Sequence, residues 1–571
     1  MTTRLFTVLL GCGLVLTILP GCNQLGHERE TGVTAPHGMV VTAHPEASEI
    51  GVAILKKGGS AVDAACAIEL ALAVSYPVAG NIGGGGFMVM RFNDGTVQSI
   101  DYREKAPAKA TRDMYLDENS EVVSGLSTRT AMAVGVPGTI HGVITVHQRY
   151  GRLKFSEVIQ PAIDLARNGF PVTENQAHRF NGSRERFIEM NGAGIPFIKD
   201  EAWQAGDILN QPDLARSLER IRDLGLAGFY EGETARLIIG ELSGGEREIK
   251  GVMAMNDLQD YASVWRHPIE AGYKDFKIIS MAPPSSGGIG LAQLLKMVEP
   301  FPIAEWGWQD PATMHVMIEA EKRVYADRAE YLGDPDFYPV PVDALLDDTY
   351  LERRFDDFSM EHATDTDLIG QGQGITGESE ETTHYSVVDQ EGNAVAGTTT
   401  LNGGFGCGIL VTGAGFFLNN EMDDFSSKPG YPNIYGLVGG EANAIQPGKR
   451  MLSSMTPTIV EKGNDLFMVV GSPGGSTIIT SVFQTILNVI EHEMTMQEAV
   501  RVPRFHHQWK PEVVFYEAGS LPDSLITILE EKGHKLQERG SIGRVDAILK
   551  RSDGTYEGGA DPRGDDTARG Y

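Results

Sequence analysis

The chain has 571 residues, of which 41% are hydrophobic and 22% charged, so its composition is that of a folded globular protein and excludes a disordered or fibrous one. Lysine and arginine number 48 against 77 for aspartate and glutamate, which gives a formal net charge of −29. This acidic balance argues against a nucleic acid or an anionic membrane surface as a partner. The 68 glycines follow no fixed period, so collagen is excluded and many tight turns are expected.

The first residues have the pattern of an export signal. Arg4 precedes an apolar run over 5–19, which ends in Pro20-Gly21-Cys22 and is too short to be a comfortable transmembrane helix. The end of this run resembles the cleavage box of bacterial lipoproteins, in which residues 1–21 are removed and Cys22 receives a lipid. Plain secretion without a lipid is the alternative. In both cases we expect the mature protein outside the cytoplasm, in the periplasm or at the cell surface.

Cysteine and histidine give no sign of a metal site. Cys12 lies in the predicted signal, so only Cys66 and Cys407 remain beyond Cys22, too few for a disulfide scaffold. His506 and His507 are adjacent, which on a strand directs the two rings to opposite faces. No HExxH or CxxC motif occurs. We therefore expect neither a metal nor a cofactor.

The predicted elements change in character along the chain. Helices are expected over 45–57 and 61–76, a strand pair over 87–92 and 97–102, and mostly helices in the middle, including 311–331. Residues 369–381 are glycine-rich and acidic without hydrophobic periodicity, which indicates a flexible tether. From Thr382 the pattern becomes β-hairpins, followed by a long apolar helix near 477–491.

The strands predicted over 382–389 and 394–401 form a hairpin. If it is symmetric about Glu391, Thr382 lies opposite Thr400 and the two hydroxyls can hydrogen-bond. A threonine pair alone is ordinary sheet structure. The predicted tether before the hairpin gives the threonine pair a catalytic interpretation. A cut before Thr382 would free an α-amine with a pKa of about 8, and this amine would be a base held beside a hydroxyl nucleophile.

A glycine turn lies between the predicted strand 466–470 and the helix that begins near Thr477. Gly474 and Gly475 there can aim free backbone N–H groups at an anion or oxyanion. The turn lacks the Lys-Ser/Thr pair of a phosphate-binding loop. A second glycine run, 83–86, precedes a strand instead of a helix, so we expect no dinucleotide site.

Three polar groups have two interpretations each. Glu421 and Asp424 are three residues apart and can converge on an ammonium group, or form a solvated acidic turn. Arg103 at a strand end can clamp a carboxylate, although a surface ion pair is commoner. Ser453 and Ser454 can donate hydroxyl hydrogens to a carboxylate, but alone they are uninformative.

Taken together, these motifs resemble the γ-glutamyltransferase (glutathione hydrolase) family of N-terminal-nucleophile hydrolases over about 38–571. The matching segments are 58–65, 79–87, 101–104, 325–328, 382–386, 419–425, 452–455, 471–475 and 503–507. The resemblance implies an α+β fold, the αββα four-layer sandwich. It also implies a precursor cut between Glu381 and Thr382. The large subunit 22–381 and the small subunit 382–571 would remain one folded body, a heterodimer from one precursor.

The resemblance implies a role for each candidate residue. Thr382 would be the nucleophile and its amine the base, Thr400 would hold its hydroxyl, and Gly474 and Gly475 would bind the oxyanion. Arg103, Ser453 and Ser454 would bind the α-carboxylate of the substrate. Asn402, Glu421 and Asp424 would surround its α-amine, and Tyr435 would lie in an active-site lid.

The implied substrate is a small molecule, glutathione or another γ-glutamyl compound. Its glutamyl group would pass through an ester on Thr382 to water, an amino acid or a peptide. Two alternatives remain. One is a cephalosporin (glutaryl) acylase of the same fold, which has less use for an ammonium site. The other is an inactive extracytoplasmic binding lipoprotein.

Overall fold

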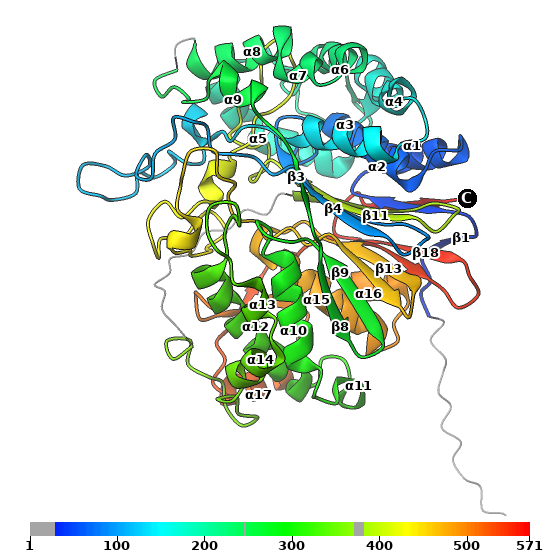
Figure 1. Ribbon diagram of the computed structural model, residues 1–571, viewed down its shortest axis with the longest axis vertical. Coiled ribbons are helices and arrows are strands. Elements are labelled where there is room, and N and C mark those ends of the chain that lie inside the picture. The colour runs from blue at the N-terminus through cyan, green and yellow to red at the C-terminus, as the bar shows by residue number, and fades with distance from the viewer. Residues whose placement is uncertain (1–28, 245–246, 370–381) are drawn as a thin grey trace, which may run out of the picture.

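Two seven-stranded sheets stack face to face in the computed structural model, and helices cover the outer face of each (Figure 1). The structure describes residues 29–244, 247–369 and 382–571. The predicted signal, Cys22, most of the predicted tether and Glu381 lie outside these ranges. The architecture is the αββα sandwich that the resemblance implied.

The first sheet has the predicted hairpin at its centre. Its strands, in spatial order, are β19 (Thr567–Gly570), β2 (Met39–Thr42), β10 (Thr382–Val388), β11 (Ala394–Thr400), β3 (Gly85–Arg91), β4 (Val97–Asp101) and β7 (Val264–Arg266). Thr382 pairs with Thr400, so the register predicted from symmetry about Glu391 is confirmed. The strand predicted over 87–92 starts earlier, at Gly85. A Cβ at Gly86 would lie 2.4 Å from the Thr398 carbonyl oxygen, so only glycine lets β3 approach β11 this closely.

The second sheet packs against the first through apolar side chains. Its strands are β1 (Val33–Ala35), β18 (Tyr556–Ala560), β17 (Asp546–Lys550), β13 (Asp465–Gly471), β12 (Thr458–Lys462), β9 (Phe276–Ser280) and β8 (Ile269–Tyr273). Val41 and Val89 from the first sheet meet Ile459 and Val469 from the second in one buried cluster. Each sheet contains strands that precede and strands that follow 370–381 in the chain. The two predicted subunits therefore share both sheets.

Helices form the outer layers (Figure 1). The layer over the first sheet contains α1 (Pro45–Lys56), α2 (Ala61–Ser75), α3 (Thr139–Tyr150), α4 (Phe155–Asn168), α5 (Glu174–Asn191), α6 (Pro212–Leu224), α7 (Ala227–Tyr230), α8 (Gly232–Ser243) and α9 (Met255–Gln259). The layer over the second contains α10 (Gly287–Val298), α11 (Ile303–Trp306), α12 (Pro311–Tyr331), α13 (Val342–Leu345), α14 (Asp348–Arg354), α15 (Ile478–Ile490), α16 (Met496–Arg501) and α17 (Asp523–Glu531). Every residue of α2 is buried, and Ser60 caps its start through a reciprocal bond with Asp63.

Smaller elements complete the chain. They are the strands β5 (Phe170–Pro171), β6 (Ile208–Leu209), β14 (Phe505–His506), β15 (Val514–Glu517) and β16 (Leu536–Arg539), and the 3₁₀ turns η1 (Ala131–Ala133), η2 (Glu421–Asp424), η3 (Glu441–Asn443) and η4 (Gly475–Thr477). None of the helices among the described residues is long and apolar enough to cross a membrane.

Candidate active site

The first strand of the central hairpin begins at the predicted nucleophile. The Thr382 hydroxyl donates to Oγ1 of Thr400 across the strand pair, at 3.5 Å. The backbone N–H of Asn402 also donates to Thr400 Oγ1, at 2.8 Å. All three residues are buried. The β10–β11 register thus places a second hydroxyl beside Thr382, in the position expected for a partner that orients it.

The glycine turn lies next to this hydroxyl pair. Gly474 has φ of 136° and Gly475 has φ of 54°, values that L side chains rarely adopt. A Cβ at Gly475 would lie 2.4 Å from the ring of Tyr435, so the close approach also requires glycine. The long helix was expected to start near Thr477, but the turn enters η4 first and α15 begins at Ile478. Gly475 shares one cavity with Thr382, and Gly474 shares a neighbouring cavity with it.

Charged side chains also contribute to this cavity. Arg103 lies two residues beyond the end of β4, and its guanidinium pairs with Glu421 at 2.7 Å and with Asp424 at 2.5 Å. Burial raises the pKa of both carboxyl groups, and the positive charge of Arg103 opposes that rise. Of the two interpretations of Glu421 and Asp424, the structure therefore excludes a solvated turn. Arg103 likewise is no surface residue, since its side chain is 1% exposed.

The remaining predicted residues complete the cavity. Ser454 Oγ accepts a hydrogen bond from Arg328 at 3.2 Å, and the Ser453 carbonyl accepts one from the Ser286 hydroxyl at 2.7 Å. The Tyr435 hydroxyl donates to the Asn402 carbonyl at 2.5 Å, which fixes Tyr435 over the site. The cavity is lined by Arg103, Arg328, Thr382, Thr400, Asn402, Asp424, Tyr435, Leu437, Ser453, Ser454, Met455, Gly475 and Ile478. Glu421 lies behind its wall, against Arg103.

Three polar residues of the site received no role from the sequence. Arg328 belongs to the segment 325–328 that carried part of the resemblance, so its importance was signalled without a function. Asn433 donates to Asp424 at 2.8 Å. Glu104 is buried 3.7 Å from Arg103, and burial raises the pKa of its carboxyl group to about 8. Its place directly after Arg103 in the sequence was the available signal.

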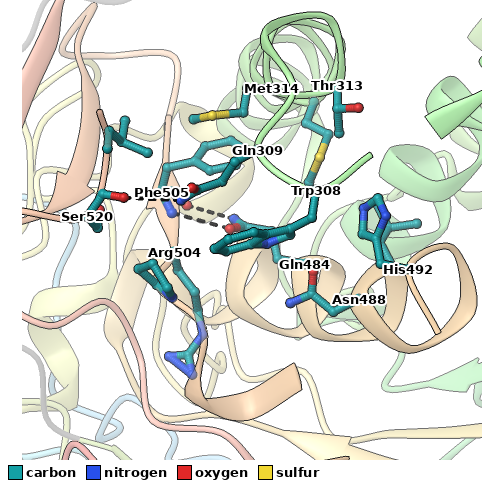
Figure 2. Close-up of a pocket in the computed structure, with 14 residues that line it drawn as sticks. Trp308, Gln309, Thr313, Met314, Gln484, Asn488, His492, Arg504, Phe505 and Ser520 are labelled. Atoms are coloured by element: carbon teal, nitrogen blue, oxygen red, sulfur yellow. Dashed lines mark hydrogen bonds between the residues drawn. The ribbon is translucent and has the colours of Figure 1, made fainter. Parts of the chain in front are cut away.

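A different, mostly apolar cavity lies between the loop before α12 and α15 (Figure 2). Trp308, Met314 and Phe505 line it. Its amide side chains already have partners: Gln484 exchanges hydrogen bonds with the Phe505 backbone at 2.7 and 3.2 Å, and Gln309 donates to the Ser520 carbonyl. It shares no lining residue with the Thr382 cavity. We therefore assign it to packing.

Within the described ranges, His315, Glu319 and His534 bring three possible metal-binding atoms within 4.8 Å of one another. The two rings hydrogen-bond to each other at 2.7 Å. Glu319 is paired with Lys322 and Arg323, both at 2.8 Å. The two cations already neutralise the carboxylate, so a divalent cation would add uncompensated charge to a buried site. We assign no metal to this cluster.

Stacked sheets between helical layers, with a buried threonine at the start of a central strand, define the fold class of the N-terminal-nucleophile hydrolases. The profile of the family described as gamma-glutamyltranspeptidase matches residues 47–571. The chain therefore belongs to the gamma-glutamyltranspeptidase family.

Known relatives agree with this membership. A glutathione hydrolase proenzyme of Escherichia coli (strain K12) is 46% identical, over 94% of this chain and 93% of the relative. An Acylase ACY 1 proenzyme of Pseudomonas sp. (strain V22) is 36% identical, over 94% and 93%. Among solved structures, the cephalosporin acylase of Bacillus halodurans superposes with a TM-score of 0.82 at 26% identity, covering 95% of this chain and 97% of its own. The gamma-glutamyltranspeptidase of Helicobacter pylori gives 0.56 at 41% identity, covering 62% and 99%.

Proposed function

We propose that the chain is a self-processing γ-glutamyltransferase and glutathione hydrolase, cut between Glu381 and Thr382 into a large subunit 22–381 and a small subunit 382–571. The observation that carries the proposal is the composition of the Thr382 cavity. It brings together a hydroxyl pair, a glycine turn and groups of both charges. A γ-glutamyl group carries both an α-ammonium and an α-carboxylate, and it matches these charges.

The reaction is acyl transfer through a covalent ester. The α-amine of Thr382, freed by the cut, takes the hydroxyl proton as Oγ1 bonds to the γ-carbonyl carbon. Gly474 and Gly475 donate backbone N–H groups to the oxyanion, each contributing about 3–4 kcal/mol in comparable sites. The C–N bond then breaks, and the leaving amine takes the proton. Water, or the amine of an acceptor, attacks the ester and releases the glutamyl group, which restores the Thr382 hydroxyl.

Substrate binding exchanges internal ion pairs for pairs with the ligand. Arg103 is paired with Glu421 and with Asp424 in the structure. The α-ammonium of the ligand binds Glu421, Asp424 and Asn402. The α-carboxylate of the ligand binds Arg103, Ser453 and Ser454. The exchange is balanced only when the ligand supplies both charges. A ligand with the carboxylate alone would leave buried carboxylates without a counter-charge, which is costly.

This balance distinguishes the proposed function from a cephalosporin (glutaryl) acylase. One structural neighbour is named a cephalosporin acylase. A glutaryl group has the carboxylate of a glutamyl group but lacks its ammonium. The test compares kcat/KM for γ-glutamyl-p-nitroanilide and glutaryl-p-nitroanilide, which share one leaving group. We expect a preference of about 100-fold or more for the γ-glutamyl compound. A preference for glutaryl would overturn the proposal in favour of the acylase, and turnover of neither would favour an inactive binding protein.

We also propose that residues 1–21 direct export and that Cys22 carries a lipid, which would hold the enzyme at a membrane surface. The support is the sequence alone, a basic start and a short apolar run that ends in Gly21-Cys22. The mass of the mature large chain tests this. It should begin at Cys22 with added acyl groups, and an unmodified chain would leave secretion without an anchor.

A further inference from the structure

The Thr382 cavity contains two buried guanidinium groups with different surroundings. Arg103 pairs with two carboxylates. Arg328, near the end of α12, is 6% exposed and lines the same cavity. Its Nε donates to Ser286 Oγ at 3.0 Å and its Nη2 donates to Ser454 Oγ at 3.2 Å. In the part of the chain that the structure describes, no carboxylate lies within 4.0 Å of Arg328, so its hydrogen-bond partners there are neutral.

A buried cation without a counter-ion is costly. Burial lowers the pKa of Arg328, but arginine keeps its charge in proteins because its ordinary pKa lies so far above neutrality. Asp424 attracts Arg328 at longer range, but it is already bonded to Arg103 and Asn433. An anion inside the cavity would give Arg328 the direct ionic partner that its two hydroxyl contacts do not supply.

We propose that Arg328 is a second substrate-binding arginine, which pairs with the α-carboxylate of the γ-glutamyl group together with Ser454. This role rests on the proposed function and goes beyond the roles that the family resemblance implied. Arg103 can serve a ligand carboxylate only as Glu421 and Asp424 turn to the ammonium. Arg328 joins Arg103 at the ligand carboxylate and breaks no ion pair of its own in doing so, because its present partners are hydroxyls.

Ser454, which is bonded to Arg328, fits this role. Ser454 Oγ accepts a hydrogen bond from Arg328, so its own hydroxyl hydrogen can point away from the guanidinium. A carboxylate in the cavity would accept from that hydrogen with one oxygen and from Arg328 with the other. Arg328 therefore both binds the ligand and orients the serine donor.

The test measures KM and kcat for γ-glutamyl-p-nitroanilide in Arg328→Gln and Arg328→Lys. Gln removes the charge and Lys keeps it. We expect Arg328→Gln to raise KM about tenfold or more with kcat within about threefold, and Arg328→Lys to have a KM between Gln and wild type. The matched control is Arg220→Gln. Arg220 also bonds to two hydroxyls, those of Ser217 and Thr234 at 2.9 Å, but it lies outside the cavity.

The outcomes separate this inference from the proposed function. If the wild-type enzyme turns over the substrate and both Arg328 variants have the wild-type KM, the role of Arg328 is overturned. The proposed function would be unaffected by that result. A fall in kcat at unchanged KM would also overturn the role of Arg328, because a structural role would suffice. A wild-type protein without turnover would overturn the proposed function itself. If Arg328→Gln is not cut at Thr382, Arg328→Lys decides: a raised KM supports the role, and a wild-type KM contradicts it.

Discussion

The two walls of the Thr382 cavity are built in different ways. The hairpin wall, formed by Thr382, Thr400 and Gly475, uses hydroxyls and backbone held by strand register and a tight turn. The charged wall is formed by Arg103, Arg328 and Asp424, with Glu421 behind it. Its ion pairs join distant segments, since Arg103 and Asp424 are 321 residues apart. The hairpin wall suits bond making, and the charged wall suits recognition of the substrate. Changes to the first should therefore lower kcat, and changes to the second should raise KM.

The largest effect is expected from Thr382→Ala. Without the hydroxyl the precursor is not cut, and turnover of γ-glutamyl-p-nitroanilide falls by at least about 10³-fold. A denaturing gel should show one band in place of two. Thr383→Ala is the control, since Thr383 is also buried but its hydroxyl has no hydrogen-bond partner among the described residues. Two bands and full activity in Thr382→Ala would refute the role of the hairpin wall.

Gly475→Ala tests the turn. Its Cβ would meet the Tyr435 ring and displace the backbone N–H from the oxyanion, so kcat should fall about 100-fold with a smaller change in KM. Gly463→Ala is the control, because Gly463 has φ of 62° but open space around it. Equal kcat losses in the two variants would show that backbone strain, and not the place of Gly475, causes the defect.

Asp424→Asn should act through the charged wall. The α-ammonium loses an ionic partner, so KM for γ-glutamyl-p-nitroanilide should rise about tenfold while kcat changes little. The preference over glutaryl-p-nitroanilide should shrink as well. Asp423→Asn serves as the control, since Asp423 bonds to Ser127 and to the Ile434 backbone instead of Arg103. An unchanged KM in Asp424→Asn would contradict the division between the two walls.

The smallest effect concerns pH and stability. Burial raises the pKa of Asp423 to about 7, above its unfolded value near 3.8. Between these values the folded protein keeps a proton that the unfolded chain releases, so this group's contribution to stability falls as pH rises through that window. Asp423→Asn should remove this contribution and reduce the fall in Tm from pH 5 to pH 8 by about 1–2 °C. An unchanged pH dependence of Tm would mean that Asp423 is ionised throughout.

The two walls also differ in how far the sequence predicts them. The Thr382–Thr400 pairing follows from strand periodicity and one turn, which are local signals. The contacts of Arg103 with Glu421 and Asp424 depend on loops from distant parts of the chain, so no local pattern could place them together. Only the family resemblance predicted that Arg103, Glu421 and Asp424 belong to one site. Arg328 remained without a role, because an arginine inside a helix usually packs or pairs at the surface.

The most direct test of the central role of Thr382 is mass spectrometry of the enzyme quenched with acid during turnover of glutathione. We predict a small chain that begins at Thr382 and carries one γ-glutamyl group on its first residue. An active enzyme that remains a single chain, or one that carries the γ-glutamyl group on another residue, would contradict the account.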